Sequence, residues 1–393
     1  MKKSIFFLTV LLFSILLVSF KVNYLTRSST IPLLITNDTL TTDVTKTSTF
    51  KNIAIIFLMG KQTLNGIEYV TLSEALEKDY VTLFETGNVN ELAITNKSNH
   101  FIFIHAGDIV KGGRQDRTIG ADIIVAPEIK DLPLASFCVE ASRWSQRGGE
   151  SAQEFSVNEK MLPSRNLKMA AKQDQNQSEV WSSVSLQQDK LNENVSKMKG
   201  EDIDVRDSRS STSLQLTLEN KDLDSLCNVY KMHLQTLPDS AIGFAYAING
   251  EIFGGDIYNN NKLFREMWPK LLNSIIVEAI AEFKSDTIEY SLPNNPVAEL
   301  NKVYAGDTST RNINASTKQI SYETKTMVAH HSFDLAHNGW IHKSYIVKDT
   351  SQTCQRYEID FDRNNRINED FLQEQQINPM NQEIEPVQQQ IQQ

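Results

Sequence analysis

Residues 101–144 read FIFIHAGDIVKGGRQDRTIGADIIVAPEIKDLPLASFCVEASRW, and this stretch determines the fold that we expect. The apolar runs Phe101–Ile104 and Ile123–Val125 predict buried strands. A charged loop that contains glycine lies between them. A loop of this kind, held by buried strands, is where proteins often place a binding or catalytic site. We therefore expect the functional site of this chain between His105 and Trp144.

The patterns on either side of this stretch predict a mixed fold. Apolar runs indicate strands at 51–57, 81–84, 91–95, 101–105, 117–119, 123–125, 134–139, 241–248 and within 319–347. Helical spacing indicates helices at 73–78, with Ser73 as N-cap, and at 151–192, 222–234 and 263–283. Residues 197–213 are polar and predict a flexible surface excursion. The expected fold class is α+β, a mostly antiparallel sheet or sandwich with helices packed on it, preceded by an N-terminal export or anchor helix.

Composition predicts how the chain is divided. We expect a signal peptide or membrane anchor at 1–27 and a polar linker at 28–50. Residues 51–350 should form a single α+β domain, with a core at 51–285 and C-terminal strands at 315–350. The tail at 364–393 consists mostly of Asn, Gln and Glu, which predicts disorder.

The first twenty residues predict export. Met1-Lys2-Lys3 precedes an apolar run from Ile5 to Phe20, in the order typical of a signal peptide. Phe20 lies where a cleavage site needs a small residue, which favours a retained anchor over a cleaved signal. No Cys follows the run, so a lipoprotein anchor is excluded. We expect an extracytoplasmic domain, exported or anchored to the inner membrane by this segment.

The net charge limits the partners that we expect, and the cysteine count limits the number of disulfides. The net charge of −10 and the pI near 5.3 predict no bulk attraction to nucleic acid. We expect no nucleic-acid partner, and membrane contact through the N-terminal segment only. Three cysteines, Cys138, Cys227 and Cys354, allow at most one disulfide, so packing must hold the fold together.

The segment KGGRQDR at 111–117 carries the clearest ligand-binding signal. Its two glycines allow successive backbone N–H groups to point into one concavity, which suits a small anion. Its three cations add charge, and an arginine fork grips phosphate or carboxylate. The segment lacks the G-x-x-x-x-G-K-[ST] pattern of a P-loop. A hairpin turn with solvated charges is the alternative. The candidate ligand-binding residues here are Lys111, Gly112, Gly113, Arg114, Gln115 and Arg117.

A second charged group follows the strand that ends near Cys138. Cys138 and Arg143 have the spacing of a Cys-dependent phosphatase loop, but Glu140 would place a negative charge inside such a loop. We expect Cys138 to be a small buried hydrophobe. Glu140 and Arg143 could be an acid and a clamp that face the glycine loop, with Trp144 as a further binding residue. The alternative is a buried ion pair that braces two strands.

Three acids are candidates for acid/base catalysis: Asp108, Asp116 and Glu140. Asp256, after two glycines, could reach Asp108 or Glu140 as a general base or metal ligand, although turn chemistry explains it as well. The histidines show no zinc spacing such as H-E-x-x-H, so the sequence predicts no metal site. It names no cofactor either.

Several of these motifs resemble one family. The blocks are ELAITN at 91–96, AGDIV at 106–110, GGRQDR at 112–117, FCVE at 137–140 and Arg143-Trp144. Together they are similar to the ARG (ADP-ribosylglycohydrolase) and rhodanese-phosphatase-superfamily-associated protein domain, a bacterial and archaeal domain of unknown function. The resemblance covers about 50–285, and reaches 350 if the C-terminal strands are included. It implies no reaction and no catalytic residue. By analogy with the associated enzymes, it implies a phosphate-bearing ligand.

Two hypotheses follow, and the sequence leaves open whether the protein is an enzyme. In the first, an exported or membrane-anchored domain binds or hydrolyses a nucleotide or ADP-ribose-like ligand, a small anionic molecule, at 111–117. In the second, the chain is a non-catalytic envelope module for interaction or structure, and the same charges brace the hairpin.

Overall fold

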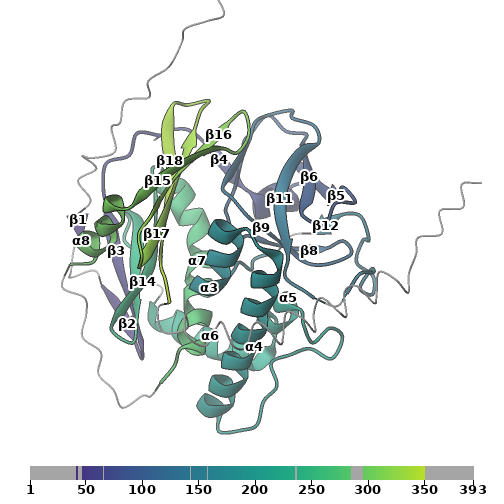
Figure 1. Ribbon diagram of the computed structural model, residues 1–393, viewed down its shortest axis with the longest axis vertical. Coiled ribbons are helices and arrows are strands. Elements are labelled where there is room, and N and C mark those ends of the chain that lie inside the picture. Colours follow the sequence, from purple (N-terminus) through teal and green to yellow (C-terminus); the bar gives the residue numbers. More distant parts are fainter. Residues whose placement is uncertain are drawn as a thin grey trace, which may run out of the picture. The chain divides into compact units, whose positions relative to one another are not determined.

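The largest sheet joins strands from both ends of the described chain (Figure 1). In spatial order it holds β1 (Thr41–Thr42), β3 (Ile53–Met59), β13 (Ala241–Ile248), β14 (Glu251–Tyr258), β18 (Gly339–Val347), β17 (Met327–Asp334), β16 (Thr317–Glu323) and β15 (Asp307–Asn312). β2 (Ser48–Phe50) also pairs with β3. β13 is buried along its whole length, which agrees with its unbroken apolar sequence. The C-terminal strands therefore extend the sheet that β3 and β13 begin.

The computed structural model describes residues 41–42, 47–64, 66–141, 143–156, 158–234, 237–284 and 295–349. The expected export segment at 1–27 and the expected disordered tail at 364–393 lie outside these residues. β1 and β2 fall within the expected polar linker, where both pair with β3. Among the described residues, no helix has the length and apolar character needed to span a membrane.

A second sheet closes into a small barrel. Its order is β12 (Phe155–Ser156), β8 (Ile109–Gly112), β9 (Arg117–Ile119), β11 (Leu132–Cys138), β6 (Glu91–Asn96) and β5 (Val81–Glu85). The two ends meet where Phe84 bridges Glu154 and the Glu85 N–H donates to the Gln153 carbonyl at 2.9 Å. Buried side chains such as Leu83, Leu92 and Leu134 form its core. Closure matters because a closed sheet has few free edges.

A three-stranded sheet lies between the two cores. It consists of β10 (Ile123–Val125), β7 (Phe101–Ile104) and β4 (Tyr69–Thr71), and β4 pairs with β7 in parallel. Neighbouring residues of a strand point to opposite faces, so Ile102 packs into the barrel core while Phe103 packs into the larger core. The register pairs Ile123 with Ile104, and this brings the residues just beyond them to the same end of the sheet.

The central helix is α7 (Asn261–Ala281), which contacts β13, β14 and β4 as well as α4 (Gln177–Lys199) and α6 (Lys221–Leu234). Asn260 caps it, and its Oδ1 accepts the Leu263 N–H at 3.0 Å. The other helices are α2 (Leu72–Glu77), α3 (Arg165–Lys168), the π-helix η2 (Met169–Asp174), α5 (Leu214–Leu218), α8 (Pro296–Asn301) and the 3₁₀ helix η3 (Lys302–Ala305). The α+β class with mostly antiparallel sheets is confirmed; the predicted N-terminal helix lies outside the described residues.

Two helix starts differ from the expectation. α2 is capped by Thr71, whose Oγ1 accepts the Glu74 N–H at 3.3 Å, whereas the predicted cap Ser73 donates to the Asn158 carbonyl at 3.0 Å. The predicted helix at 151–192 is divided, because β12 pairs with β8 and completes the barrel before the first helical turn at Arg165. Pairing across the barrel overrides the local helical pattern there.

The predicted flexible excursion at 197–213 is ordered for a clear reason. α4 continues to Lys199, and Gly200 ends it with φ of +75°. The following residues bury Val205 and Ser213 fully. The Ser213 side chain then accepts the Leu216 N–H at 3.1 Å and begins α5. Polar side chains of this segment therefore form hydrogen bonds within the fold, as Ser213 does.

Candidate functional site

The glycine loop joins β8 to β9 and packs tightly against Glu154. Gly112 has φ of +129° and Gly113 has φ of +57°, conformations that favour glycine. A Cβ at Gly112 would lie 2.8 Å from the Glu154 carbonyl oxygen. Gly112 donates its N–H to Asp116 Oδ1 at 3.2 Å, and Gly113 donates to the Glu154 carbonyl at 3.3 Å. The protein's own acceptors thus use the amides that we expected to be available to an anion.

Asp116 and Glu140 lie together beside this loop, and both are fully buried. Arg147 grips Asp116 through two hydrogen bonds of 2.8 and 3.0 Å, and Arg143 Nε donates to Glu140 Oε2 at 2.8 Å. Burial opposes the charge of Arg147, but Asp116 raises its pKa above the usual value. Bidentate arginine–carboxylate pairs are among the strongest contacts in proteins. These contacts indicate that the acid–arginine pairs stabilise the loop. The acid/base roles of Asp116 and Glu140 stay predictions.

Arg117 binds a different acid. Its Nη2 lies 3.2 Å from Glu85 Oε2, and its Nη1 donates to the Val89 carbonyl and, at 2.6 Å, to Cys138 Sγ. Burial raises the pKa of Cys138 to about 11, although the Arg117 charge opposes that rise. The thiol is therefore neutral at physiological pH, in agreement with the expectation of a small buried hydrophobe.

A groove of about 630 Å³ opens beside the loop, a volume usual for small-molecule sites. Its lining consists of Thr82, residues 84–89, Arg114, Arg117, Trp144 and residues 152–154. Three predicted ligand-binding residues thus share one groove. Arg114 is exposed, and its N–H donates to Glu85 Oε1 at 3.1 Å. Within the described part of the chain, the Arg114 guanidinium makes no hydrogen bond or ion pair.

Other predicted site residues lie away from this groove. Lys111 pairs with Glu219 at 2.7 Å, and Gln115 Nε2 donates to a backbone carbonyl at 2.8 Å. Asp108 forms a separate buried ion pair, with its Oδ1 2.7 Å from Lys270 Nζ. None of the three predicted catalytic acids lines the groove.

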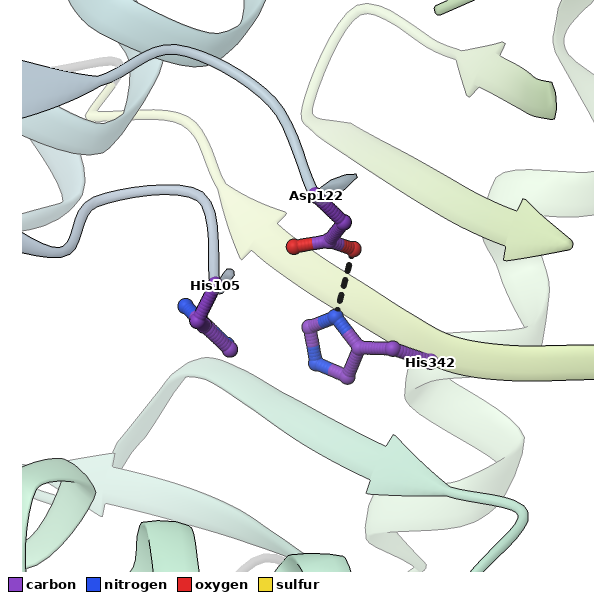
Figure 2. Close-up of side chains that lie close together, drawn as sticks. All are labelled: His105, Asp122 and His342. Atoms are coloured by element: carbon purple, nitrogen blue, oxygen red, sulfur yellow. Dashed lines mark hydrogen bonds and ion pairs between the residues drawn. The ribbon is translucent and has the colours of Figure 1, made fainter. Parts of the chain in front are cut away.

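A second polar cluster, which the sequence did not indicate, lies at the end of the three-stranded sheet (Figure 2). His105 follows β7, Asp122 precedes β10 and His342 belongs to β18, and one donor atom from each lies within 4.8 Å of the others. His342 Nδ1 is 2.7 Å from Asp122 Oδ2, and its Nε2 is 3.2 Å from Asp256 Oδ1. All four side chains are buried, where polar groups are costly unless they are paired.

The charges of this cluster are set by burial and by the carboxylates. Burial alone would lower the pKa of His342, but Asp122 and Asp256 on its two ring nitrogens raise it above the ordinary value. Burial would raise the pKa of both carboxyls, yet His342 holds both below the ordinary range. His105 differs, because burial lowers its pKa to about 4 and leaves the ring neutral at pH 7.

Sequence reasoning missed this cluster because no short motif connects its members. The pairing of Ile104 with Ile123 brings His105 and Asp122 together, and pairing of β14 with β18 brings in Asp256 and His342. This cluster could have been predicted only from the register of the strand pairs. Asp256, considered earlier as a partner for Asp108 or Glu140, contacts His342.

Comparison with family models matches residues 41–346. The chain belongs to the ARG and Rhodanese-Phosphatase-superfamily-associated Protein domain family. The matched region of this domain includes the glycine loop, the groove and the His105–Asp122–His342 cluster, and it continues into β18. Neither the curated proteins nor the solved structures give a match. Because the family description states no reaction, function must be argued from the geometry of these sites.

Proposed function

We propose that this chain binds a small anionic ligand in the groove beside the glycine loop, with Arg114 as the principal contact for the anion. The observation that carries the proposal is an exposed guanidinium in the wall of a groove of about 630 Å³. An arginine fork can donate two parallel hydrogen bonds to a phosphate or carboxylate. The charge of Arg117 in the same wall is already matched by Glu85, so it positions the wall more than it attracts a ligand.

The other lining residues narrow the class of ligand. Phe84 and Trp144 offer ring surfaces, while Thr82 and Asn88 offer hydroxyl and amide groups for hydrogen bonds. Glu154 would repel a second negative charge nearby. A phosphate or diphosphate at Arg114, joined to a neutral ring or sugar, fits this lining. Nucleotides, ADP-ribose-like compounds and sugar phosphates belong to this class, and the family's association with ADP-ribosylglycohydrolases points the same way by analogy.

We propose binding without hydrolysis as the activity of the groove. Catalysis would need an acid or base within hydrogen-bond reach of the reacting group. The three predicted catalytic acids are instead paired with cations: Asp116 with Arg147, Glu140 with Arg143 and Asp108 with Lys270. Glu85 and Glu154 do line the groove, but Glu85 is paired with Arg117. These contacts favour a receptor or sensor domain over a hydrolase.

A non-catalytic envelope module is the second candidate. It is supported by the internal use of the loop amides and by the buried acid–arginine network, since both are explained fully by stability of the barrel. In that case the groove takes no small molecule, and the charges near it brace β8, β9 and the segment after β11.

We propose further that the domain acts outside the cytoplasm, held by its N-terminal segment. The support is the apolar run from Ile5 to Phe20 after Lys2 and Lys3, which lies outside the described residues. In a bacterial host, protease added to intact spheroplasts should then degrade the domain. A domain that is degraded only after lysis would contradict export.

Calorimetric titration of the full-length chain tests the groove. ADP-ribose, AMP, glucose 6-phosphate and inorganic phosphate are added separately, and at least one organic phosphate should bind. Arg114→Ala should weaken that binding about tenfold or more, a loss of about 1.4 kcal/mol, because a charge-assisted pair is removed. Its melting temperature should stay near the wild-type value, since the side chain is exposed.

Lys130→Ala is the matched control. Lys130 is also exposed, and it lies just before β11, at the opposite end of that strand from the loop. The Lys130→Ala variant loses one positive charge, as Arg114→Ala does, and its affinity for the organic phosphate should be unchanged. Equal losses in both variants would show a non-specific charge effect. If no compound binds and Arg114→Ala lowers the melting temperature, the second candidate is favoured.

A further inference from the structure

The His105–Asp122–His342 cluster is independent of the groove and has the composition of a metal site. We propose that these three side chains bind one divalent transition-metal ion, most readily zinc. Two imidazoles and one carboxylate are a common ligand set for such ions. The cluster has one donor atom per residue, all within 4.8 Å of one another, and it is fully enclosed by protein.

His105 has the tautomer of a metal ligand. Its Nδ1 lies 2.7 Å from the Ala106 carbonyl oxygen, which can only accept, so Nδ1 carries the proton and Nε2 carries a lone pair. This Nε2 is buried and has no hydrogen-bond partner among the described residues. A histidine that binds a metal normally donates its other N–H to a carbonyl or carboxylate. His105 therefore has an unused acceptor and the tautomer that a metal ligand requires, and one of its ring nitrogens lies within 4.8 Å of the donor atoms of the other two side chains.

His342 and Asp122 supply the other two donors. His342 Nδ1 and Asp122 Oδ2 are 2.7 Å apart, while two donors on one tetrahedral zinc lie about 3.3 Å apart. The ion would take the place of the proton that these atoms share. His342 would keep its Nε2–H on Asp256, now 3.2 Å away, which fixes the ring in a carboxylate–histidine–metal arrangement.

The surroundings of the cluster also suit a metal ion. The Ala106 N–H and the Ser332 hydroxyl donate to the Asp122 carboxylate at 2.9 and 2.6 Å, which fixes its orientation. A cavity of about 10 Å³, large enough for one water molecule, borders His105 and Asp256, although Asp122 and His342 do not line it. Lys172 also lines this cavity, with its Nζ 2.9 Å from Ser344 Oγ. Asp122 and Asp256 supply two negative charges for a divalent ion, whereas the neighbouring Lys172 opposes cation binding, and more strongly for a more highly charged ion.

The test uses the full-length chain, dialysed first against a chelator and then against Zn²⁺, Co²⁺ or Mn²⁺. Bound metal is measured by mass spectrometry after gel filtration, together with the melting temperature. The wild type should retain about one zinc per chain and melt at a higher temperature with zinc. His105→Leu should retain none. His331→Leu, which removes another buried histidine that is outside the ligand set, should bind zinc as the wild type does.

Stability in the absence of metal separates a ligand from a structural histidine. Without metal, His105→Leu should melt close to the wild-type temperature, because it removes a buried acceptor that has no partner and also the Nδ1–H that donates to the Ala106 carbonyl, two opposing effects. It should not respond to zinc. Failure of the wild type to retain any of the three ions, or retention of zinc by His105→Leu, overturns the proposal. If His105→Leu does not fold, X-ray absorption of the cobalt-loaded wild type decides, and a coordination shell without imidazole overturns it.

Discussion

Asp108 and Lys270 form an ion pair that should dominate the stability of the region between the barrel and α7. Lys270 Nζ lies 2.7 Å from Asp108 Oδ1, and the two side chains are 5% and 2% exposed. Lys270 also donates to Ser73 Oγ at 3.1 Å, and Asp108 Oδ2 accepts the His105 N–H at 3.1 Å. Both charges are therefore fully enclosed, and each depends on the other for compensation.

Lys270→Met removes the cation and leaves the Asp108 carboxylate buried. Breaking a buried pair from one side costs about 3–5 kcal/mol, so we expect the free energy of unfolding to fall by that amount. The double variant Asp108→Asn/Lys270→Met buries no charge, and it should recover at least half of the loss. The free energy of unfolding of Asp108→Asn alone should lie between those of Lys270→Met and of the double variant, because Lys270 keeps its contact with Ser73.

Urea unfolding followed by tryptophan fluorescence measures all four proteins, and a double-mutant cycle gives the coupling energy. A coupling energy of several kcal/mol is expected. Loss of less than about 1 kcal/mol in Lys270→Met would refute the reasoning. So would a double variant no more stable than Lys270→Met. A small loss would mean that solvent reaches Asp108, and its predicted catalytic role would regain support. A double variant no more stable than Lys270→Met would mean that the unpaired carboxylate does not cause the loss.

Three further outcomes follow from the structure. Gly112→Ala should cost about 3 kcal/mol in urea unfolding, because its Cβ meets backbone at 2.8 Å, whereas Gly148→Ala, with positive φ but open space, should cost about 1 kcal/mol. Burial lowers the pKa of His330 to about 3, while the unfolded chain takes up this proton near pH 6.5. This group alone should therefore lower the stability by about 2 kcal/mol between pH 7 and pH 5, and His330→Gln should reduce the loss seen in the wild type by that amount. Iodoacetamide should leave Cys138 unmodified in the native chain and alkylate it in urea, as mass spectrometry would show, since burial raises its pKa to about 11; rapid native alkylation would contradict this.

The elements with strong periodicity could be predicted from sequence, and those built by long-range pairing could not. The apolar run at 241–248 is β13, and the long amphipathic pattern at 263–283 is α7, which begins two residues earlier at Asn261. The predicted helix at 151–192 was wrong over residues 151–164, because β12 completes a barrel whose other strands lie many residues away. Local spacing carries no information about such a partner.

The candidate site was predicted in part. Arg143 pairs with both Asp116 and Glu140 beside the glycine loop, an arrangement that fits the predicted buried ion pair as well as an acid and a clamp that face the loop. The groove could not be predicted, since its walls include residues 84–89 and 152–154, which only barrel closure brings to Arg114. The histidine cluster has the same origin. His105 and Asp122 flank two short strands and His342 lies within a third, and they become a site only through the register of β7 with β10 and of β14 with β18.

The order of strands in the large sheet has a consequence for the newly made chain. β14 lies between β13, its immediate neighbour in sequence, and β18, which is the last described strand to be synthesised. Until β18 pairs, the β14 edge stays open, and the cluster lacks His342. Non-local pairing of this kind is slow, and the open edge is prone to aggregation. A nascent chain cannot complete this domain until about residue 347 has been made, so a holdase that covers β14 during synthesis should raise the yield of native protein.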